Sequence, residues 1–405
     1  MRIAIISSGF LPITDGVSIT LWYRLRYLSK LGYHVLVFCP DYAPIAHLYP
    51  DWQNYVGEIF PNIRVINLPS ISFVNLNFER NVIPDSYKIV LEKLQLFKPD
   101  IIHVDEPERL WLGFLKRPGL DFARQAKIPC VSFFHTNFIE YLDDYLSLPK
   151  VMLASLKLTM RYHRNWIYNG YDLTLVSSPS TANKLTNLGF KKVLNAQLLG
   201  VETEKYQREV KEPDYFLKHY HIAGLEKKVK LVFLGRLTPD KGWNFILNSL
   251  EQFTRAIACQ NLAFLIAGEG NMKEEIAAKM SHFIPNSYFL GRVDPQKVPS
   301  LLINSDIYIT ASEKETRGLT VLEALASGIP VVAPRAGGLV DSIKDGDNGL
   351  LFIPQNTDDF IEKTKTLVDN EVLRQQMRVK RIEVLNQYGW EQSVNNLVDI
   401  WQSLL

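Results

Sequence analysis

Short apolar runs alternate with longer helical stretches along this sequence, and the alternation occurs twice. The apolar runs are rich in β-branched residues and are bounded by Gly, Pro or Asp. Strands of this kind, separated by helices, are typical of parallel sheets that are covered by helices on both faces. The sequence therefore predicts an α/β fold with two doubly wound, Rossmann-like domains.

The predicted strands and helices fall into two sets. In the first half we predict strands at Arg2–Ser8, His34–Cys39, Arg64–Leu68, Asp100–Val104, Cys130–His135 and Leu173–Ser177, with helices that include Val17–Leu31, Tyr87–Phe97 and Val151–Tyr168. In the second half we predict strands at Lys230–Leu234, Ala263–Ala267, Ser287–Leu290, Ile307–Thr310, Val331–Ala333 and Gly349–Phe352.

The periodic pattern breaks after Leu199, where a charged stretch runs to Lys228. We therefore place an N-terminal domain at residues 1–199 and a C-terminal domain at residues 200–387. The loops at the carboxyl ends of both sheets are expected to face one another across a cleft, because open α/β sheets bind ligands at that edge.

The composition is that of a soluble protein, since 47% of the 405 residues are hydrophobic and 22% are charged, with a formal net charge of +2. No apolar run approaches the roughly eighteen residues of a membrane-spanning helix, and the first residues lead directly into a predicted strand. We expect a cytoplasmic protein with no nucleic-acid partner. Cys39, Cys130 and Cys259 lie among apolar neighbours, which predicts reduced core thiols.

A dense polar pattern lies in residues 315–328, where a predicted strand is followed by a run of helix formers. Glu315 falls in the loop at the carboxyl end of that strand, and Glu323 falls about one turn into the helix. Gly318 and Leu319 lie between them, at a helix N-terminus whose N–H groups can hold phosphates. The segment thus offers acceptors for sugar and ribose hydroxyls and donors for the diphosphate between them.

Two cations, Arg236 and Lys241, lie in a glycine-bounded loop after the strand at Lys230–Leu234. They can neutralise a diphosphate, Arg as a fork and Lys as a point charge; two cations in a surface loop are the alternative. Glycine-containing loops also follow the next two predicted strands and allow a bound base to approach the backbone. Their candidate residues are Gly268, Arg292 and Val293.

In the N-terminal half, Gly16 opens a predicted helix after the first strand, where its N–H can approach a phosphate. His135 stands at the carboxyl end of a predicted strand and is our candidate catalytic histidine; a core histidine with satisfied hydrogen bonds is the alternative. Asp105 and Glu106 also follow a strand. We interpret this acidic pair as a solvated loop, with contact to an acceptor as the alternative.

The sequence requires no metal ion. Arg236, Lys241 and the helix amides can supply the positive charge that a divalent ion would otherwise provide. We interpret the acidic pairs at Asp143–Asp144 and Asp345–Asp347 as a helix surface and a turn. The expected cofactor content is therefore none, with a nucleotide sugar as the substrate.

A basic stretch in residues 150–164 contains no acid, and its cations alternate with apolar residues. This pattern predicts an amphipathic helix that contacts an anionic membrane surface or an anionic acceptor, which gives a peripheral location at the inner face of a membrane. An ordinary surface helix is the alternative. The four cations are Lys150, Lys157, Arg161 and Arg164.

These segments together resemble the family 4 glycosyltransferases, retaining enzymes of the GT-B fold. The resemblance runs from Gly16 to Gly338, and its specific part is the Glu-x7-Glu pattern with the trailing Ala-Ser-Gly-Ile-Pro-Val-Val. It implies a nucleotide sugar, most often a UDP-sugar, bound mainly by the second domain, and a last helix (residues 388–405) that packs back on the first. It assigns the ribose to Glu323, the sugar hydroxyls to Glu315, the diphosphate to Arg236 and Lys241, the base to the backbone near Arg292 and Val293, and first-domain contributions to Gly16 and His135.

The resemblance implies a same-face internal return, in which the leaving phosphate accepts the proton of the acceptor. No second carboxylate is evidently placed as a nucleophile, which disfavours a double displacement. The enzyme then acts by charge stabilisation and positioning.

The sequence departs from the family pattern at Arg317, where an aromatic residue is usual, and at Glu202, where an aspartate is usual. Arg317 leaves the donor sugar open, because it faces either an acidic sugar or solvent. The segments around His103 and His135 look most similar to the branch of sulfoquinovosyl and galactosyl transferases that act on diacylglycerol lipids, and exopolysaccharide-building members share them. We predict a lipid-linked or polysaccharide acceptor; the alternatives are a synthase with a soluble sugar or sugar-phosphate acceptor and a non-catalytic sugar-nucleotide-binding protein.

Overall fold

The computed structural model describes residues 1–73, 76–145 and 149–405. The chain divides into two compact units. Unit 1 holds Met1–Ile139, Leu148–Leu199 and Trp390–Leu405, and unit 2 holds Glu140–Ser147 and Gly200–Gly389.

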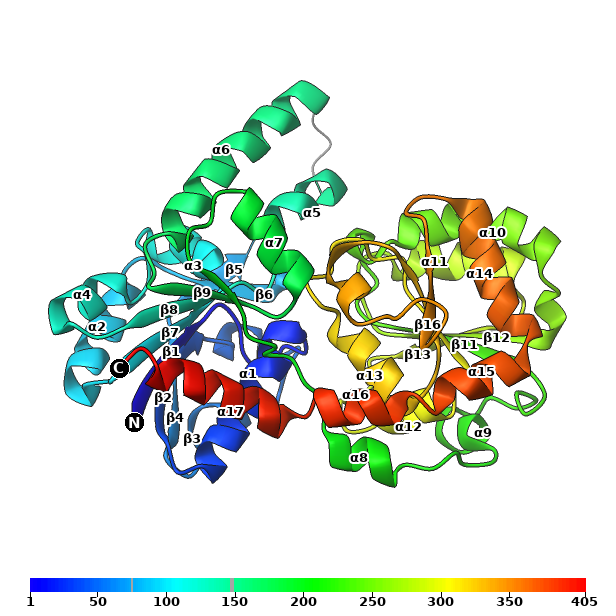
Figure 1. Ribbon diagram of the computed structural model, residues 1–405, viewed down its shortest axis with the longest axis horizontal. Helices are drawn as coiled ribbons and strands as arrows, with labels where there is room; N and C mark the ends of the chain where they lie inside the picture. Colours follow the sequence, from blue (N-terminus) through cyan, green and yellow to red (C-terminus); the bar gives the residue numbers. More distant parts are fainter. Residues whose placement is uncertain (74–75, 146–148) are drawn as a thin grey trace. The chain divides into compact units, whose positions relative to one another are not determined.

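Unit 1 is built on an eight-stranded sheet with the order β10-β9-β8-β7-β1-β2-β4-β3, in which all pairs are parallel except β3 with β4 (Figure 1). A separate antiparallel hairpin is formed by β5 (Ser70–Phe73) and β6 (Leu76–Val82). The strands of the large sheet are β1 (Arg2–Ser7), β2 (His34–Pro40), β3 (Gly57–Phe60), β4 (Ile63–Leu68), β7 (Ile101–Asp105), β8 (Cys130–Phe133), β9 (Leu173–Val176) and β10 (Val193–Asn195).

Helices cover both faces of this sheet, because successive strand side chains point to opposite sides. Ile3 and Ile5 pack in one core with α1 and α17, whereas Ala4 and Ile6 pack in the other with α2 and α3. Trp401 of α17 is fully buried in the first of these cores. The helices are α1 (Gly16–Lys30), α2 (Ser86–Phe97), α3 (Pro107–Phe114), α4 (Leu120–Ala126), α6 (Lys150–Tyr168), α7 (Pro179–Asn187) and α17 (Trp390–Gln402). Helix α5 (Phe138–Tyr145) begins in unit 1, and its residues from Glu140 onward are counted with unit 2.

Unit 2 contains a fully parallel six-stranded sheet with the order β13-β12-β11-β14-β15-β16. Its strands are β11 (Val229–Leu234), β12 (Leu262–Ala267), β13 (Ser287–Gly291), β14 (Ile307–Ile309), β15 (Val331–Pro334) and β16 (Gly349–Phe352). Its helices are α8 (Thr203–Arg208), α9 (Tyr215–Tyr220), α10 (Trp243–Ala256), α11 (Lys273–Phe283), α12 (Val298–Ile303), α13 (Leu319–Ser327), α14 (Thr357–Asp369), α15 (Glu371–Arg378) and α16 (Arg381–Gln387).

The predicted α/β class with Rossmann-like parallel sheets is confirmed, and each predicted strand has a counterpart to within a few residues. Strands β3, β5, β6 and β10 were not predicted from the sequence. The three cysteines are free thiols, as predicted; Cys39 and Cys130 are buried and Cys259 is partly buried.

Candidate functional site

The predicted binding residues of unit 2 lie at one edge of its sheet. All six strands are parallel, so their carboxyl ends meet at the same edge, and the strand order reverses between β11 and β14. Such a reversal point is where open α/β sheets bind ligands. Four neighbouring strands deliver the candidates: Arg292 and Val293 follow β13, Gly268 follows β12, Arg236 and Lys241 follow β11, and Glu315 to Glu323 follow β14.

An ion pair joins the two loops at this reversal point. Lys241 Nζ lies 2.6 Å from Glu315 Oε1, and their side chains are 19% and 20% exposed. Arg236 Nη2 lies 3.3 Å from Asp240 Oδ2, and Asp240 also lies 4.0 Å from Lys241 Nζ. Asp240 is buried and was not among the candidates predicted from the sequence. The two cations assigned to a diphosphate are therefore held by carboxylates that fix their positions.

Close backbone contacts hold these loops together. A Cβ on Gly268, whose φ is +146°, would lie 1.8 Å from the carbonyl oxygen of Gly235. A Cβ on Gly338 would lie 1.9 Å from the carbonyl oxygen of Thr316, and Gly338 N donates to Glu315 O at 2.8 Å. A larger residue at either position would push the loops of Arg236 and Glu315 out of place.

Helix α13 begins as predicted at Leu319. Its N-cap is Gly318, with φ +81°, and no side chain caps the helix. The N–H groups of the first turn therefore face their surroundings without a capping side chain, an arrangement that suits a phosphate. Glu323 is in the second turn of α13, where burial raises the pKa of its carboxyl group to about 8 and a hydrogen bond with Tyr206 of α8 opposes the rise.

The structure decides where Arg317 lies. Its side chain is buried, Nη2 donates to Tyr388 Oη at 2.6 Å, and its guanidinium lies 5.0 Å from the centre of the Tyr388 ring. The solvent-facing alternative for Arg317 is therefore wrong. Neither Tyr388 nor Tyr206 was singled out from the sequence, since both contact the Glu315–Glu323 segment only through the fold.

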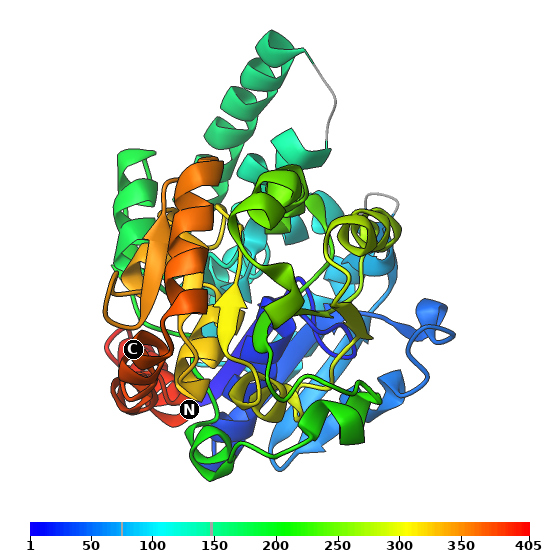
Figure 2. The same cartoon turned by 90° about the vertical axis from the view of Figure 1, so that its right-hand side faces the viewer.

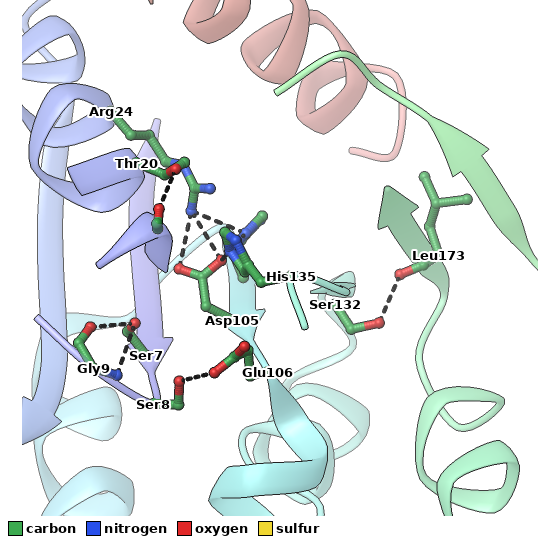
Figure 3. Close-up of polar contacts among 12 residues, drawn as sticks. Ser7, Ser8, Gly9, Thr20, Arg24, Asp105, Glu106, Ser132, His135 and Leu173 are labelled. Carbon is green, nitrogen blue, oxygen red and sulfur yellow. Dashed lines mark hydrogen bonds and ion pairs between the residues drawn. The ribbon is translucent and has the colours of Figure 1, made fainter. Parts of the chain in front are cut away.

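The predicted candidates of unit 1 lie at the carboxyl edge of its own sheet. Gly16 is the first residue of α1, whose N-cap Asp15 accepts from Ser18 N at 2.8 Å. His135 lies two residues beyond β8, and its Nε2 is 2.9 Å from Asp105 Oδ1. Figure 3 shows Arg24 of α1 and His135 converging on Asp105 at the end of β7.

Asp105 is the centre of a buried network. Arg24 Nη1 donates to Asp105 Oδ1 at 3.2 Å, to Oδ2 at 3.1 Å and to His103 Nε2 at 3.1 Å. Burial opposes ionisation of Asp105, but Arg24 and both histidines hold its pKa well below the usual range. Burial and Arg24 lower the pKa of His103 to about 4, and Asp105, whose Oδ1 lies 3.2 Å from His103 Nε2, opposes that shift. Because an ionised carboxylate can only accept, His135 donates to Asp105 Oδ1 through Nε2–H, which fixes its tautomer.

Glu106 is also buried, so the solvated-loop interpretation of Asp105 and Glu106 is wrong. Ser8 Oγ donates to Glu106 Oε2 at 2.6 Å (Figure 3). Glu106 has φ +52°, which is rare for a residue with a side chain and is found mostly where the surrounding structure enforces it. The acidic pair is thus a built feature at the end of β7.

Models of two glycosyltransferase families match most of the chain. "Glycosyltransferase Family 4" matches residues 14–197, and "Glycosyl transferases group 1" matches residues 220–383. The chain belongs to glycosyltransferase family 4.

Curated relatives of this family 4 glycosyltransferase match over most of its length. A sulfoquinovosyl transferase of Arabidopsis thaliana is 26% identical over 383 residues, which cover 92% of this chain and 68% of the relative. A GDP-mannose-dependent alpha-mannosyltransferase of Mycobacterium tuberculosis is 27% identical over 87% of this chain and 84% of its own. An alpha-monoglucosyldiacylglycerol synthase of Streptococcus pneumoniae is 25% identical over 87% of this chain and 75% of its own.

Solved structures share the fold. Sucrose-phosphate synthase from Thermosynechococcus elongatus has a TM-score of 0.79 at 17% identity and covers 100% of this chain and 98% of that one. HepE of Anabaena in complex with UDP-glucose has a TM-score of 0.73 at 16% identity and covers 100% of both chains. The glycosyltransferase therefore has the GT-B fold.

The prediction that Arg164 of the glycosyltransferase contacts a membrane is wrong. Arg164 is 3% exposed, Nη1 donates to Asn137 Oδ1 at 3.2 Å, and its guanidinium lies 5.3 Å from the centre of the Phe190 ring. Lys150 is exposed and Lys157 and Arg161 are partly exposed on the same helix, α6. Only these three cations of the predicted four can meet an outside surface.

A metal-binding cluster and a membrane-spanning helix are both absent from the described part of the chain. Within residues 1–73, 76–145 and 149–405, no group of three or more His, Cys, Asp and Glu side chains is arranged to hold a metal ion. None of the helices in the described part of the chain is long and apolar enough to cross a membrane.

Proposed function

We propose that this glycosyltransferase moves a sugar from a UDP-sugar to a lipid-linked or polysaccharide acceptor, with retention of configuration. The proposed donor rests on the ion pair between Lys241 and Glu315 at the reversal point of the unit 2 sheet. Arg236 lies in the same loop as Lys241, and helix α13, whose N-terminus is not capped by a side chain, follows the loop of Glu315. Cations, free helix amides and carboxylates in one place suit a diphosphate joined to two sugars. HepE, which has the same fold, was crystallised with UDP-glucose.

Each donor group then has a role. Arg236, Lys241 and the first-turn amides at Gly318 and Leu319 bind the diphosphate, Glu315 binds the sugar hydroxyls and Glu323 the ribose. The backbone at Gly268, Arg292 and Val293 borders the base. In unit 1, Gly16 stays our candidate phosphate contact and His135 our candidate catalytic histidine. Because positive charge comes from side chains and amides, we propose that no divalent metal is needed. GDP-mannose is a second candidate donor, because relatives at 25–27% identity are named as GDP-mannose-dependent.

For the acceptor, the printed names of two relatives refer to glycolipid synthesis: sulfoquinovosyl transferase and alpha-monoglucosyldiacylglycerol synthase. The helix α6 supports a lipid acceptor. Its N-terminal half stands clear of the unit 1 sheet in both views (Figures 1 and 2). Exposed apolar side chains on it include Val151 (79% exposed), Met152 (58%) and Leu158 (55%), next to the cations of the same helix. Exposed apolar and basic residues on one helix suit an anionic bilayer surface.

Transfer in the presence of a chelator tests the donor half. We expect sugar transfer or donor hydrolysis from UDP-glucose or another UDP-sugar to continue unchanged in excess EDTA, because the phosphate charge is met by Arg236 and Lys241. The assay measures release of the nucleoside diphosphate, UDP or GDP, with each member of a panel that includes UDP-glucose, UDP-galactose, UDP-sulfoquinovose and GDP-mannose. Loss of all activity in EDTA with recovery in Mn²⁺ would contradict metal independence. Release of GDP from GDP-mannose, without release of UDP from any UDP-sugar, would show that the donor is GDP-mannose.

Vesicle co-sedimentation tests the membrane contact. The enzyme is expected to bind phosphatidylglycerol vesicles more tightly than phosphatidylcholine vesicles, and binding should weaken as salt rises. Lys150→Glu/Arg161→Glu should bind at least tenfold more weakly, since each cation near an anionic surface contributes about 1 kcal/mol. Lys191→Glu/Lys192→Glu, which changes two exposed cations elsewhere in unit 1, is the control. Equal binding by both variants would contradict the role of α6.

A further inference from the structure

A groove with a volume of about 300 Å³ lies in unit 1 between the β5–β6 hairpin and the end of α3. Its walls are mainly apolar, and its rim carries Ile71 (59% exposed), Leu112 (54%) and Leu115 (61%). Isolated exposed apolar residues are common, but three around one concave site indicate a binding surface. The volume is at the lower end for small-molecule sites.

The fold brings the two walls close together at Gly113. A Cβ at this position would lie 2.4 Å from the carbonyl oxygen of Val82, so α3 is pressed against β6. Both residues line the groove. The groove is therefore set by a backbone contact within unit 1 and does not depend on side-chain rotamers alone.

One part of the groove wall is polar. The lining residue Asn81 is buried, and its Oδ1 accepts no hydrogen bond from the residues that the structure describes. Asn81 Nδ2 donates to the carbonyl oxygen of Arg109 at 3.3 Å. The Arg109 guanidinium lies 4.7 Å from the centre of the Phe73 ring, which also lines the groove, and pairs with Glu79 at 3.1 Å. A buried acceptor without a donor is costly, so this part of the wall is polar.

Helix α3 connects this groove to the polar network around Asp105. The helix begins at Pro107, directly after Glu106, and ends at Phe114 beside the groove. Eight residues of α-helix span about 12 Å. A molecule with a hydroxyl-bearing head near the start of α3 and an apolar chain near its end would match this sequence of polar and apolar surfaces.

We propose that the groove holds one hydrocarbon chain of the acceptor lipid, with the head of the lipid toward the start of α3. This inference rests on the proposed transfer to a lipid-linked acceptor. A cation stands at the apolar end, because Lys116 follows Leu115 and lies with Nζ 5.5 Å from the centre of the Tyr87 ring. That charge favours a lipid at an anionic surface over an apolar peptide. A partner helix, about 10 Å wide with its side chains, is too thick for a groove of this volume.

A fluorescent fatty acid tests the groove without turnover. The probe is 11-(dansylamino)undecanoic acid, displaced by dodecyl glucoside below its micelle concentration. The test variant is Ile71→Thr/Leu112→Gln, because Thr keeps the β-branching of a strand residue and Gln forms helices about as well as Leu. The matched control is Leu96→Gln on α2, a leucine that is 70% exposed and does not line the groove.

We expect the double variant to bind the probe about tenfold more weakly than wild type, and the control to bind within twofold of it. Equal affinity of all three proteins for the probe, or no binding of the probe to wild type, would overturn the assignment of the groove to a hydrocarbon chain. In parallel, transfer from the donor to acceptors with long and short chains is measured. If wild type glycosylates lipids but the double variant binds the probe as tightly as wild type does, only the assignment of the groove fails. If the groove binds the probe but no lipid is glycosylated by wild type, the proposed lipid acceptor fails.

Discussion

Replacing Lys241 with alanine is expected to lower kcat/KM for the donor by a factor of about 10² to 10³, which corresponds to about 2.7–4 kcal/mol of lost transition-state stabilisation. The lost group is a cation held 2.6 Å from Glu315, at the reversal point of the unit 2 sheet. The free energy of unfolding should change by less than about 1 kcal/mol, because partly exposed ion pairs stabilise proteins weakly. Arg236→Ala should behave in the same way.

The comparison needs a matched lysine and a stability measurement. Lys365 of α14 also pairs with a carboxylate, Asp369, but lies on a helix surface and not at the carboxyl edge of the sheet. Lys365→Ala should leave both kcat/KM and urea unfolding unchanged. If Lys241→Ala instead unfolds several kcal/mol more easily with unchanged turnover of the folded fraction, Lys241 is a structural residue and its assignment to the diphosphate is wrong.

The second large effect is expected in unit 1, where Asp105→Asn should lower the free energy of unfolding by about 3–5 kcal/mol. Asp105 is fully buried with Arg24, which is 2% exposed, so the substitution leaves a buried guanidinium without its counter-charge. The variant should also lose the fixed orientation of His135, whose Nε2–H donates to Asp105. Urea denaturation at pH 7 measures the first effect.

The pH dependence has a definite sign. The pKa of Asp105 is held well below its usual value in the folded protein, so its stabilisation is present above the unfolded pKa of about 4 and is lost as the pH falls. The difference between wild type and Asp105→Asn should therefore shrink in acid. Asp85→Asn is the control, because Asp85 pairs with Lys88 on the surface, where both side chains are more than 80% exposed. Equal small effects of both substitutions at pH 7 would contradict the buried network.

The parallel strands could be predicted because each is a short, apolar, β-branched run, and burial on both faces leaves that mark on the sequence. The missed strands lack it. In β3, β5 and β10 most residues whose burial is described are only partly buried or exposed, so their sequences carry polar residues and no continuous apolar run. These strands form through pairing with neighbours rather than through their own pattern.

The strand-to-helix turn that holds Glu315, Gly318 and Glu323 could also be predicted, since one local segment sets it. The mistaken predictions all depend on distant partners. Asp105 and Glu106 looked like solvated acids because their partners are distant in the sequence: Arg24 lies 81 residues before Asp105, and Ser8 lies 98 residues before Glu106. Helical periodicity alone could not separate Arg164 from the exposed cations of α6.

The same limit applies to Arg317 and Glu323. In the sequence, Tyr206 precedes the strands of the unit 2 sheet and Tyr388 follows them. No spacing rule connects these tyrosines with Glu323 and Arg317. Tyrosine hydroxyls near these positions could have been found only from the three-dimensional structure. The groove beside Gly113 is likewise a product of the contact between α3 and β6, which the sequence analysis did not include.

Titration calorimetry with UDP tests most directly the claim that unit 2 binds a nucleotide sugar, because it measures nucleotide binding without requiring the acceptor. We expect wild type and Lys365→Ala to bind one UDP per chain with the same Kd, and Arg236→Ala/Lys241→Ala to bind UDP at least tenfold more weakly, since two charge-assisted phosphate contacts are removed. GDP is titrated in parallel to identify the preferred base. Absence of binding of either nucleotide to wild type, or equal affinity in the double variant, would contradict the assignment of this edge of the sheet to a nucleotide sugar.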